Sequence, residues 1–509
     1  MAATGAARLA NRADDGVSAS METRPVKPFA PLSGVGLLLR WLVLAGAAGA
    51  LAGCMLTTDI PDPALDVPSA YKEAGRGDTA SLPELDWWRS FKSHELTALM
   101  EQAQTVNLDI AAAVARIVQA DAQARITGAA LLPTLNAGDQ ASRSKSSGVS
   151  SSGLTNSGRE ITNFSSSLSA SYELDFWGKN RDAALAAKET ATASRFDRDV
   201  VALTTLTTVA NAYFQVLAAQ DRIRTANRNI ASAQRILDAI KQRFRAGTGT
   251  DLDVAQQESV LANQRAAVPP LRQTLAQNII ALATLVARPP ESLRVSGGSL
   301  NGIAVPRVTP GLPSELLIQR PDIRRQEASL AAATANIGSA RAQFFPSIQL
   351  TGQGGYQSAA LVSLFSPHAA FFSLAAGLTQ PIFDGGAIQG NFDLTKARQD
   401  ELLQTYRKTV VSAFADVDNA LVAIKQTSEK LRLQRVVVAA SRRAFELAEQ
   451  QLKAGTADIV TVLNTQLTLF QAEDSLLQAQ LARLQAIVGL YQALGGGWKP
   501  NATGPTNAL

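Results

Sequence analysis

The chain has 509 residues and a formal net charge of +5, and 46% of its residues are hydrophobic. This charge is small for the length and no long basic block is present, which argues against a nucleic-acid-binding surface. The length suits two to four domains, although an internal duplication can fold as one body.

A secretory signal is predicted at the N-terminus. Basic residues precede an apolar stretch, Trp41 to Leu51, which is followed by the small residues Ala52 and Gly53. A basic region, a short apolar segment and small residues before the cut are typical of such signals. We therefore expect residues 1–53 to be a signal peptide, and Met21 is a candidate for the true start because residues 1–20 are polar.

Cys54 follows this signal and is the only cysteine, so no intramolecular disulfide can form. Leu51-Ala52-Gly53-Cys54 resembles the bacterial lipobox, in which the cysteine is lipidated and becomes the first mature residue. The alternative is a short buried helix with a chance cysteine. We expect a lipid such as palmitate on Cys54 and a lipidated N-terminal linker over residues 54–90. Met55, by resemblance to enterobacterial sorting, favours the outer membrane.

From Trp87 to about Ala130 the sequence has a helical pattern, which Pro133 ends. Strand-like alternation follows, and then a loop of Ser and Gly over residues 144–162. The next segment has a period of two over about a dozen residues, long enough to cross a bilayer when tilted. Its apolar face is predicted to consist of Phe164, Leu168, Ala170, Tyr172, Leu174 and Phe176.

A similar strand follows Ser347, and residues 370–383 are predicted to return beside it. The alternative is a half-buried hairpin in a soluble sheet, but the signal and the aromatic strand ends favour the membrane. Apart from the predicted signal, no segment is expected to be apolar enough for a transmembrane helix. Four strands cannot close a barrel and open edges cannot face lipid, so copies of the chain must share one barrel.

The chain repeats itself about 210 residues apart. Asn107-Leu108-Asp109-Ile110 recurs as Arg320-Pro321-Asp322-Ile323, and Phe244-Arg245-Ala246-Gly247-Thr248 recurs as Leu452-Lys453-Ala454-Gly455-Thr456. We predict two structural repeats with the same plan, each a helix, a strand pair and a long helical hairpin. They cover residues 91–300 and 301–497, and residues 498–509 form a C-terminal tail.

Each repeat contains one very long helix, because residues 179–246 and 391–454 contain neither Gly nor Pro. Such a run makes a helix of about 100 Å. Apolar residues recur every seven positions along both, while the intervening positions are mixed, so each helix should pack sideways and keep one face wet. In the second repeat these residues are Leu403, Val410, Val417, Ile424, Leu431, Val438, Phe445 and Leu452; in the first they are Ala202, Val209, Val216, Ile223, Ile230, Leu237 and Phe244.

Both long helices are predicted to end in a tight turn. Gly247 and Gly455 suit the left-handed residue after a helix, and Asp251 and Asp458 suit the N-cap of the next helix. The predicted fold is therefore mainly α with transmembrane β, with duplicated long helical hairpins and four strands per chain.

An ordered set of motifs makes the chain resemble a known family. Residues 51–497 resemble the TolC-type outer-membrane efflux channels, specifically the lipoprotein (NodT-like) branch that serves RND pumps. Each motif is weak alone, but the ordered set is highly specific. The matching motifs are Leu51-Ala52-Gly53-Cys54, Trp87-Trp88-Arg89-Ser90-Phe91, Ala129-Ala130-Leu131-Leu132-Pro133, Leu174-Asp175-Phe176-Trp177-Gly178, Arg288-Pro289-Pro290, Leu317-Ile318-Gln319-Arg320-Pro321-Asp322-Ile323, Ala342-Gln343-Phe344-Phe345-Pro346-Ser347, Phe383-Asp384-Gly385-Gly386 and the two Ala-Gly-Thr turns.

The resemblance implies a homotrimer with a twelve-stranded barrel in outer-membrane lipid and a helical tunnel through the periplasm. It also implies a periplasmic adaptor and an inner-membrane RND-type pump. The expected function is a passive exit duct for small molecules such as drugs or other toxic compounds. A duct for polypeptide secretion, as in type I systems, is the alternative. A third possibility, a structural lipoprotein with coiled-coil rods and no pore, conflicts with the alternating strands.

The resemblance assigns sites near the two turns. Gly247, Thr248, Gly455 and Thr456 match the family's adaptor-docking tips, and simple helix capping is the alternative reading. Asp253 matches a pore-facing aspartate, and we expect its three copies to form a cation-attracting periplasmic constriction rather than a solvated surface.

The second tip departs from the family pattern, which has an arginine and two aspartates there. This chain has Ala457, Thr461 and Asn464 instead, so the usual salt-bridge latch is in doubt. Asp251 and Asp458 are the other candidates for the constriction, unless they are N-caps only.

No chemistry of catalysis is evident. His94 and His368 lie in different segments without a ligand cluster, which argues against a metal centre. Gly385-Gly386 closes a strand and more plausibly turns the chain than binds phosphate. We expect a non-enzyme without cofactors other than the covalent lipid on Cys54.

Overall fold

The computed structural model describes residues 59–72, 84–145 and 160–498. The chain divides into residues 1–55 and 56–509, and every described residue belongs to the second unit. The predicted signal peptide and Cys54 lie outside the described residues, as do the tail from residue 499 and most of the loop rich in Ser and Gly.

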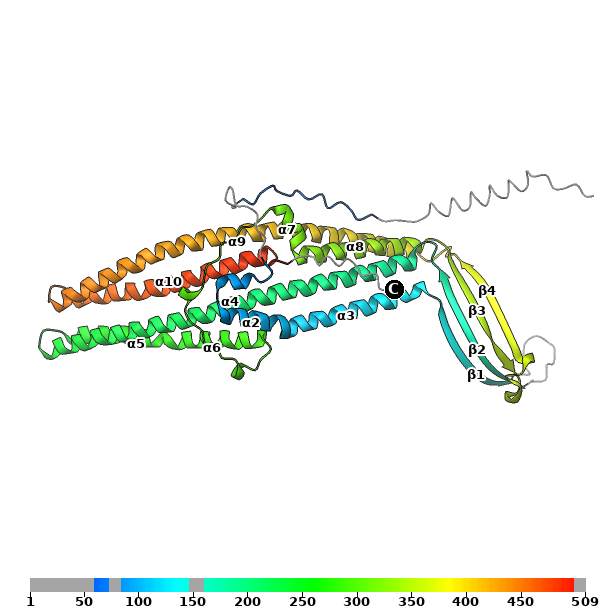
Figure 1. Ribbon diagram of the computed structural model, residues 1–509, viewed down its shortest axis with the longest axis horizontal. Coiled ribbons are helices and arrows are strands. Elements are labelled where there is room, and N and C mark those ends of the chain that lie inside the picture. Colours follow the sequence, from blue (N-terminus) through cyan, green and yellow to red (C-terminus); the bar gives the residue numbers. More distant parts are fainter. Residues whose placement is uncertain (1–58, 73–83, 146–159, 499–509) are drawn as a thin grey trace, which may run out of the picture. The chain divides into compact units, whose positions relative to one another are not determined.

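The same order of elements occurs twice along the described chain (Figure 1). The first half contains a short 3-10 helix η1 (Trp87–Phe91), α2 (His94–Val106), α3 (Leu108–Gly128), β1 (Thr134–Lys145), β2 (Glu160–Leu174), α4 (Lys179–Arg245), α5 (Asp251–Ala266) and α6 (Val268–Leu285). The second half contains α7 (Pro313–Gln319), α8 (Pro321–Ala342), β3 (Ser347–Ser358), β4 (Ala370–Thr379), α9 (Ala387–Lys453) and α10 (Ile459–Ala493).

The two long helices are confirmed. α4 and α9 have 67 residues each, which at the rise of an α-helix is about 100 Å. The heptad positions of α9 from Leu403 to Leu452 are buried except Ile424, which is partly buried. In α4 the last heptad residue differs from the prediction, because Phe244 lies in the final turn and is 45% exposed.

Two helices expected to be continuous are divided. The helical pattern between Trp87 and Ala130 breaks at Asn107, because its side chain accepts hydrogen bonds from the backbone N–H groups of Asp109 (2.9 Å) and Ile110 (3.1 Å) and so starts α3. The return leg of the first hairpin breaks after Ala267, where Pro269 and Pro270 lie in the first turn of α6. Proline is tolerated at that position because its missing N–H has no partner there.

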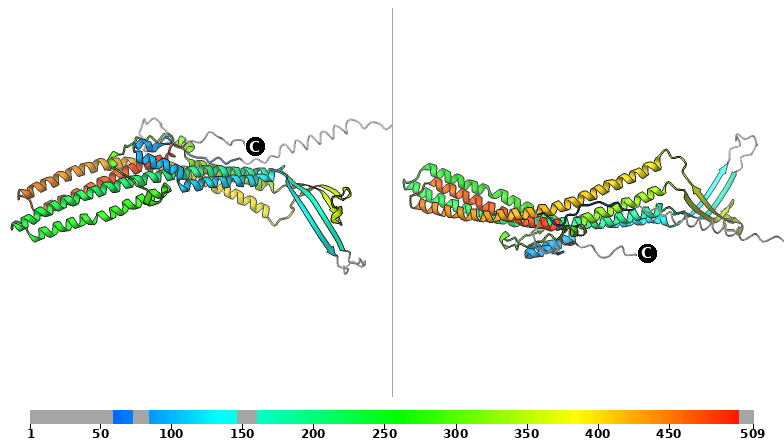
Figure 2. Two further views of the ribbon diagram at one scale, coloured as in Figure 1. Left: turned by 60° about the horizontal axis from the view of Figure 1, so that its bottom comes forward. Right: turned by 90° about the horizontal axis from the view of Figure 1, so that it is seen from above.

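Four helices form one layer, in the order α3, α4, α8, α9. α4 packs against α3 and α8, and α8 packs against α9; both turned views in Figure 2 keep α4 and α8 adjacent. Beyond this layer α4 continues into contact with α5, α6 and α10, and α9 pairs with α10. The largest core cluster joins η1, α2, α4, α6 and α10, and contains the fully buried Phe91 and Phe214.

Among the described residues, one helix is long and apolar enough to cross a membrane, contrary to the expectation of none. It is α4, but 56% of its apolar window is buried inside the protein. That burial fits a core helix better than a lipid-facing one, since helices packed against neighbours on several sides are apolar for the same reason.

The four strands form one antiparallel sheet in the order β1-β2-β3-β4. Residues paired directly across strands share a face, so the register fixes two faces. Leu168 pairs with Gly354, and Gly354 pairs with Phe372 on an apolar face. The polar face carries hydrogen bonds between side chains, such as Gln349 Nε2 donating to Ser171 Oγ at 2.6 Å.

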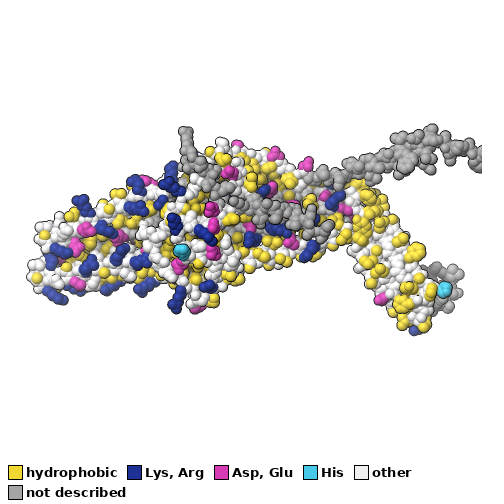
Figure 3. Space-filling view, in the orientation of Figure 1, with side chains coloured by type: hydrophobic (Ala, Val, Ile, Leu, Met, Phe, Trp, Pro, Cys, Tyr) yellow, Lys and Arg dark blue, Asp and Glu magenta, His cyan; other side chains and the backbone are white. Residues whose placement is uncertain are grey.

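The apolar face of the sheet is bare within one chain. Phe372 is 83% exposed and Leu374 is 81% exposed. Figure 3 shows hydrophobic and uncharged side chains over most of the visible strand surface, while Lys, Arg, Asp and Glu gather over the helices. A sheet with one bare apolar face and one polar face matches the predicted membrane strands. The return strand β4 ends at Thr379, four residues earlier than predicted.

Candidate functional site

The two tips of the long hairpins have the same backbone geometry. Gly247 (φ 78°) and Gly455 (φ 76°) are left-handed. The N–H of Thr248 donates to the carbonyl of Arg243, and the N–H of Thr456 donates to the carbonyl of Gln451, both at 2.9 Å. With the bonds made by the glycine N–H groups, this is a Schellman cap, which requires a residue without a Cβ penalty at positive φ. The predicted helix-ending role of both glycines is confirmed.

The threonines at these tips each make a second bond. The hydroxyl of Thr248 donates to the carbonyl of Arg243 at 3.1 Å, and the hydroxyl of Thr456 donates to that of Gln451 at 3.2 Å. Both side chains remain exposed. The four predicted docking residues therefore form two exposed turns of equal backbone shape.

The N-caps that follow differ between the tips. Asp458 is the N-cap of α10 as predicted, accepting from the N–H of Thr461 at 2.8 Å, and this bond lowers the pKa of its carboxyl. For Asp251 the N-cap prediction is wrong. Thr250 is the N-cap of α5 and forms a capping box with Asp253, whose carboxylate accepts from the N–H of Thr250 at 2.9 Å.

The predicted constriction residues are only partly brought together. Asp253 and Asp458 line one hollow of about 230 Å³ between the two tips, whereas Asp251 does not line it. The Arg243 guanidinium also lines this hollow and donates to the carbonyl of Leu452 at 3.2 Å, which joins the first tip to the second. Sequence reasoning missed Arg243, although it lies one residue before the repeated Phe244 motif.

A buried polar pair lies further from the tips. Gln257 of α5 and Gln466 of α10 are fully buried, and Gln257 Nε2 donates both to the carbonyl of Ala233 (2.9 Å) and to Gln466 Oε1 (3.3 Å). Gln257 Oε1 and Gln466 Nε2 have no partner. The apolar cluster around them contains residues of α4, α5, α9 and α10, so it holds the two hairpins together.

The repeated motif at the start of α3 and α8 anchors each repeat to its own last helix. Asn107 Nδ2 donates to the carbonyl of Leu285 at 2.8 Å, and Arg320 donates to the carbonyl of Ala493 at 3.1 Å. Arg320 also forms an ion pair with Asp322, with 2.7 Å between the guanidinium nitrogen and the carboxylate oxygen. Burial alone would raise the pKa of the Asp322 carboxyl, but the hydrogen bonds and charge of Arg320 hold that pKa below its ordinary value.

The described part of the chain contains no candidate metal centre. No group of three His, Cys, Asp or Glu side chains there could hold a metal ion. The site that the geometry does offer is a pair of exposed tips with a hollow between them and a helical layer behind them.

Comparison with known proteins supplies the family. The family model described as "Outer membrane efflux protein" matches residues 99–288 and 312–496. The pyoverdine export outer membrane protein OpmQ of Pseudomonas aeruginosa is 42% identical over 91% of this chain and 98% of its own length. The cation efflux system protein CusC of Escherichia coli is 30% identical over 88% of this chain and 97% of its own length.

A solved relative supports the same architecture. The open state of the MtrE outer membrane channel of Neisseria gonorrhoeae superposes with a TM-score of 0.77 and 33% identity, over 87% of this chain and 99% of that one. The structural neighbours are trimeric channels, and three chains of four strands close the shared twelve-stranded barrel. The chain therefore belongs to the outer membrane efflux protein family and is the outer-membrane channel of a tripartite efflux system.

Proposed function

We propose that this channel is a passive exit duct for a secreted small molecule of the pyoverdine kind. The observation that carries the proposal is the graded similarity to relatives with different cargo. The pyoverdine-exporting relative is 42% identical, whereas the cation-exporting relative is 30% identical over a similar length. Long helices that line a tunnel suit passage rather than capture.

Cells lacking this channel provide the test of cargo class. They would be compared with complemented cells for retention of pyoverdine, dyes, antibiotics and metal ions. We expect retention of pyoverdine to rise and to return to normal with the intact gene. If only metal ions or antibiotics were retained, these compounds and not a molecule of the pyoverdine kind would be the cargo. No change for any compound would favour polypeptide export instead.

The adaptor is proposed to dock on the two tips. Their equal backbone geometry offers a periplasmic adaptor repeated sites around the trimer, and the pump behind that adaptor is of the RND type. Thr248→Cys or Thr456→Cys allows site-directed crosslinking in cells, because Cys54 is the only cysteine of the wild type and lipidation would block its thiol. Crosslinks to one adaptor from both positions would support docking, and Ser144→Cys at the other end of the molecule is the control. Equal crosslinking from all three positions would contradict it.

The lipid anchor is a separate proposal. Lipidation of Cys54 would fix the mature N-terminus to the outer membrane in addition to the barrel. Labelled palmitate should enter the wild-type protein and not Cys54→Ala. Incorporation into the alanine variant would contradict lipidation at this residue.

The constriction at the tips is proposed to be formed by Asp253, with Asp458 in the same hollow. Asp253 also caps α5, so two variants are needed to separate charge from structure. Asp253→Asn keeps an oxygen that can accept from the N–H of Thr250 but removes the charge, whereas Asp253→Ala removes both. A constriction that attracts cations predicts lower cation selectivity in both variants. A change in Asp253→Ala alone would reduce the role of Asp253 to capping.

A further inference from the structure

The layer of α3, α4, α8 and α9 has one covered face. On α9, Arg407 Nε donates to the carbonyl of Pro63 at 2.7 Å, so the N-terminal linker lies on that side. On α4, Asp199 accepts from Trp498 Nε1 at 2.9 Å, so the C-terminal end of the described chain lies on α4. A closed ring of helices has less room inside than outside, which makes this covered face the outer one.

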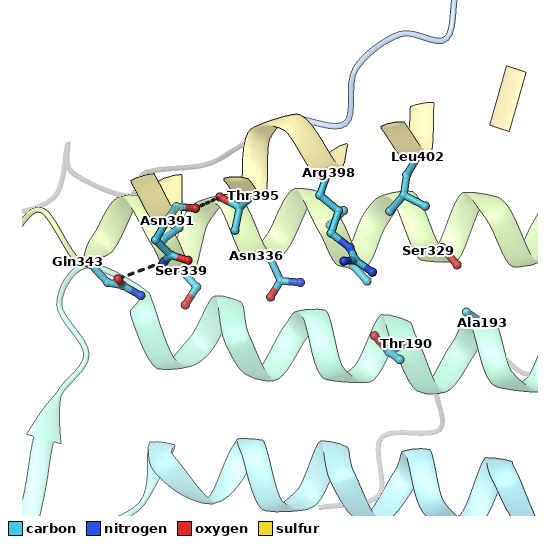
Figure 4. A pocket seen from close by; sticks show the side chains of 13 residues that line it. Thr190, Ala193, Ser329, Asn336, Ser339, Gln343, Asn391, Thr395, Arg398 and Leu402 are labelled. Atoms are coloured by element: carbon cyan, nitrogen blue, oxygen red, sulfur yellow. Dashed lines mark hydrogen bonds between the residues drawn. The ribbon is translucent and has the colours of Figure 1, made fainter. Parts of the chain in front are cut away.

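The opposite face carries a groove. Nine residues turn an α-helix by about two and a half turns, so Arg398 lies opposite Arg407, and Thr190 lies opposite Asp199. Both Arg398 and Thr190 line a groove of about 490 Å³ between α4, α8 and α9. Figure 4 shows Arg398 reaching from α9 over α8, with Asn336 to one side of its guanidinium and Ser329 to the other.

A second groove extends this surface to α3. Its volume is about 550 Å³, and it shares Thr190 and Asn336 with the first groove. Arg116 of α3 lines it. Arg116 also lies nine residues before Arg125, so the two point to opposite sides of α3. The two grooves therefore form one continuous face across all four helices, and in the trimer this face lines the tunnel.

The charged residues that line the two grooves are all positive. Apart from Arg116 and Arg398, the residues that line the two grooves are uncharged, most of them with hydroxyl or amide side chains or alanine. Both arginines are exposed, and neither makes a hydrogen bond or ion pair with another described residue. By contrast, Arg325 of α8 is neutralised by Asp197 at 2.6 Å.

We propose that Arg116 and Arg398, each present three times in the trimer, make this part of the tunnel an anion-attracting band. An unpaired guanidinium in a confined polar passage raises the local concentration of anions. The surrounding hydroxyl and amide groups can donate hydrogen bonds to oxygens of a passing solute. The inference rests on the proposed duct and adds a cargo class to it, namely solutes that carry carboxylate or other anionic oxygens.

The test is ion selectivity of the purified trimer in a planar bilayer under a potassium chloride gradient. Arg398→Gln and Arg116→Gln should each lower the anion-to-cation permeability ratio, and the double variant should lower it by at least about twofold. Arg398→Lys keeps the charge and should restore the ratio. Citrate, the anionic probe, should reduce the wild-type current more strongly than that of the double variant.

Matched controls lie on the same helices. Lys396→Gln on α9 and Arg125→Gln on α3 remove exposed charges that point away from the groove face, and should leave the permeability ratio unchanged. A double variant that forms heat-resistant trimers with the wild-type ratio and wild-type citrate block would overturn the anion band. A wild-type trimer that inserts and conducts no ions would instead overturn the proposed duct.

Discussion

The helices α4 and α9 have equal length and equivalent places in the two repeats, yet their surroundings differ. α4 buries twice as many residues as α9. It lies between α3 and α8 and then packs against α5, α6 and α10, whereas α9 packs mainly against α8 and α10. One side of α9 is therefore left without a packed helix among the described residues of its own chain.

The uncovered side of α9 is apolar. Val411, Val422 and Leu433 follow one another at intervals of eleven residues and are 63%, 40% and 49% exposed. Eleven residues come close to three whole turns, so these side chains form one stripe. α9 and α3 are the two edges of the four-helix layer, so we expect the next chain of the trimer to pack on this stripe. α4 and α9 are equally long because they are equivalent elements of the two repeats. They differ in burial because α4 lies inside the four-helix layer and α9 lies at its edge.

The largest expected effect is at Phe214 of α4. This side chain is fully buried and packs against Phe91. Phe214→Ala should lower the free energy of unfolding by about 3–5 kcal/mol, because both apolar burial and packing are lost. Chemical denaturation of the detergent-solubilised protein measures it. A loss below about 1 kcal/mol would show that α4 is not the core helix of the chain.

The equivalent residue of α9, 208 positions later, is Val422. Val422→Glu should leave the helical content of each chain intact but abolish heat-resistant trimers, because a charge enters the apolar stripe between chains. Electrophoresis without boiling and circular dichroism measure the two properties. Val422→Ala is the control and should still form trimers. Trimers of normal stability in the glutamate variant would show that the chains do not meet at the apolar stripe of α9.

A third prediction concerns how closely α4 approaches α8. A Cβ added at Gly338 would lie 2.2 Å from Asp182 Oδ2. Gly338→Ala should therefore cost about 1–3 kcal/mol of stability, and Asp182→Ala in the same chain should recover most of it. On the other side of α8, Gln399 Nε2 donates to Thr334 Oγ1 at 2.8 Å, so the contact of α8 with α9 includes a hydrogen bond. Failure of Asp182→Ala to rescue the variant would exclude the clash as the cause.

The smallest expected effect is the pH dependence of the same contact. Burial raises the pKa of the Asp182 carboxyl above its ordinary value. The stability contributed by this group is therefore complete below the ordinary pKa and is lost as the pH rises through the raised one. Asp182→Asn should melt at a slightly higher temperature than the wild type at pH 7. That difference in melting temperature should vanish below about pH 4. A difference that grows on acidification would show that the pKa of Asp182 is lowered and not raised.

Sequence reasoning reached the parts of the fold that depend on local chemistry. The length of α4 follows from the absence of Gly and Pro, whereas α9 begins four residues before the predicted run and includes Gly390. The ends of both helices follow from Gly247 and Gly455, which accept a left-handed backbone. The sheet faces follow from strict alternation. The N-cap of α5 was misassigned because Thr250 stands beside Asp251 and both residue types can cap.

Contacts between the repeats were beyond sequence reasoning. The bond from Arg243 to Leu452 depends on how one hairpin lies along the other, and no local pattern encodes that register. The face of α9 on which Arg398 lies is fixed by the contact of Arg407 with Pro63 on the opposite side, and no local pattern predicts that contact. The role of Cys54 stays a prediction, because it lies outside the described residues.

The anchors of Asn107 and Arg320 also set an order of events during synthesis. Asn107 needs the carbonyl of Leu285, and Arg320 needs that of Ala493 near the end of the chain. As the chain is exported from its N-terminus, the first repeat can be anchored when little more than half has emerged. The second repeat must wait for the last helix. A chain shortened before α10 ends would leave the half-buried guanidinium of Arg320 without this acceptor, while its ion pairs with Asp322 and Asp416 would remain.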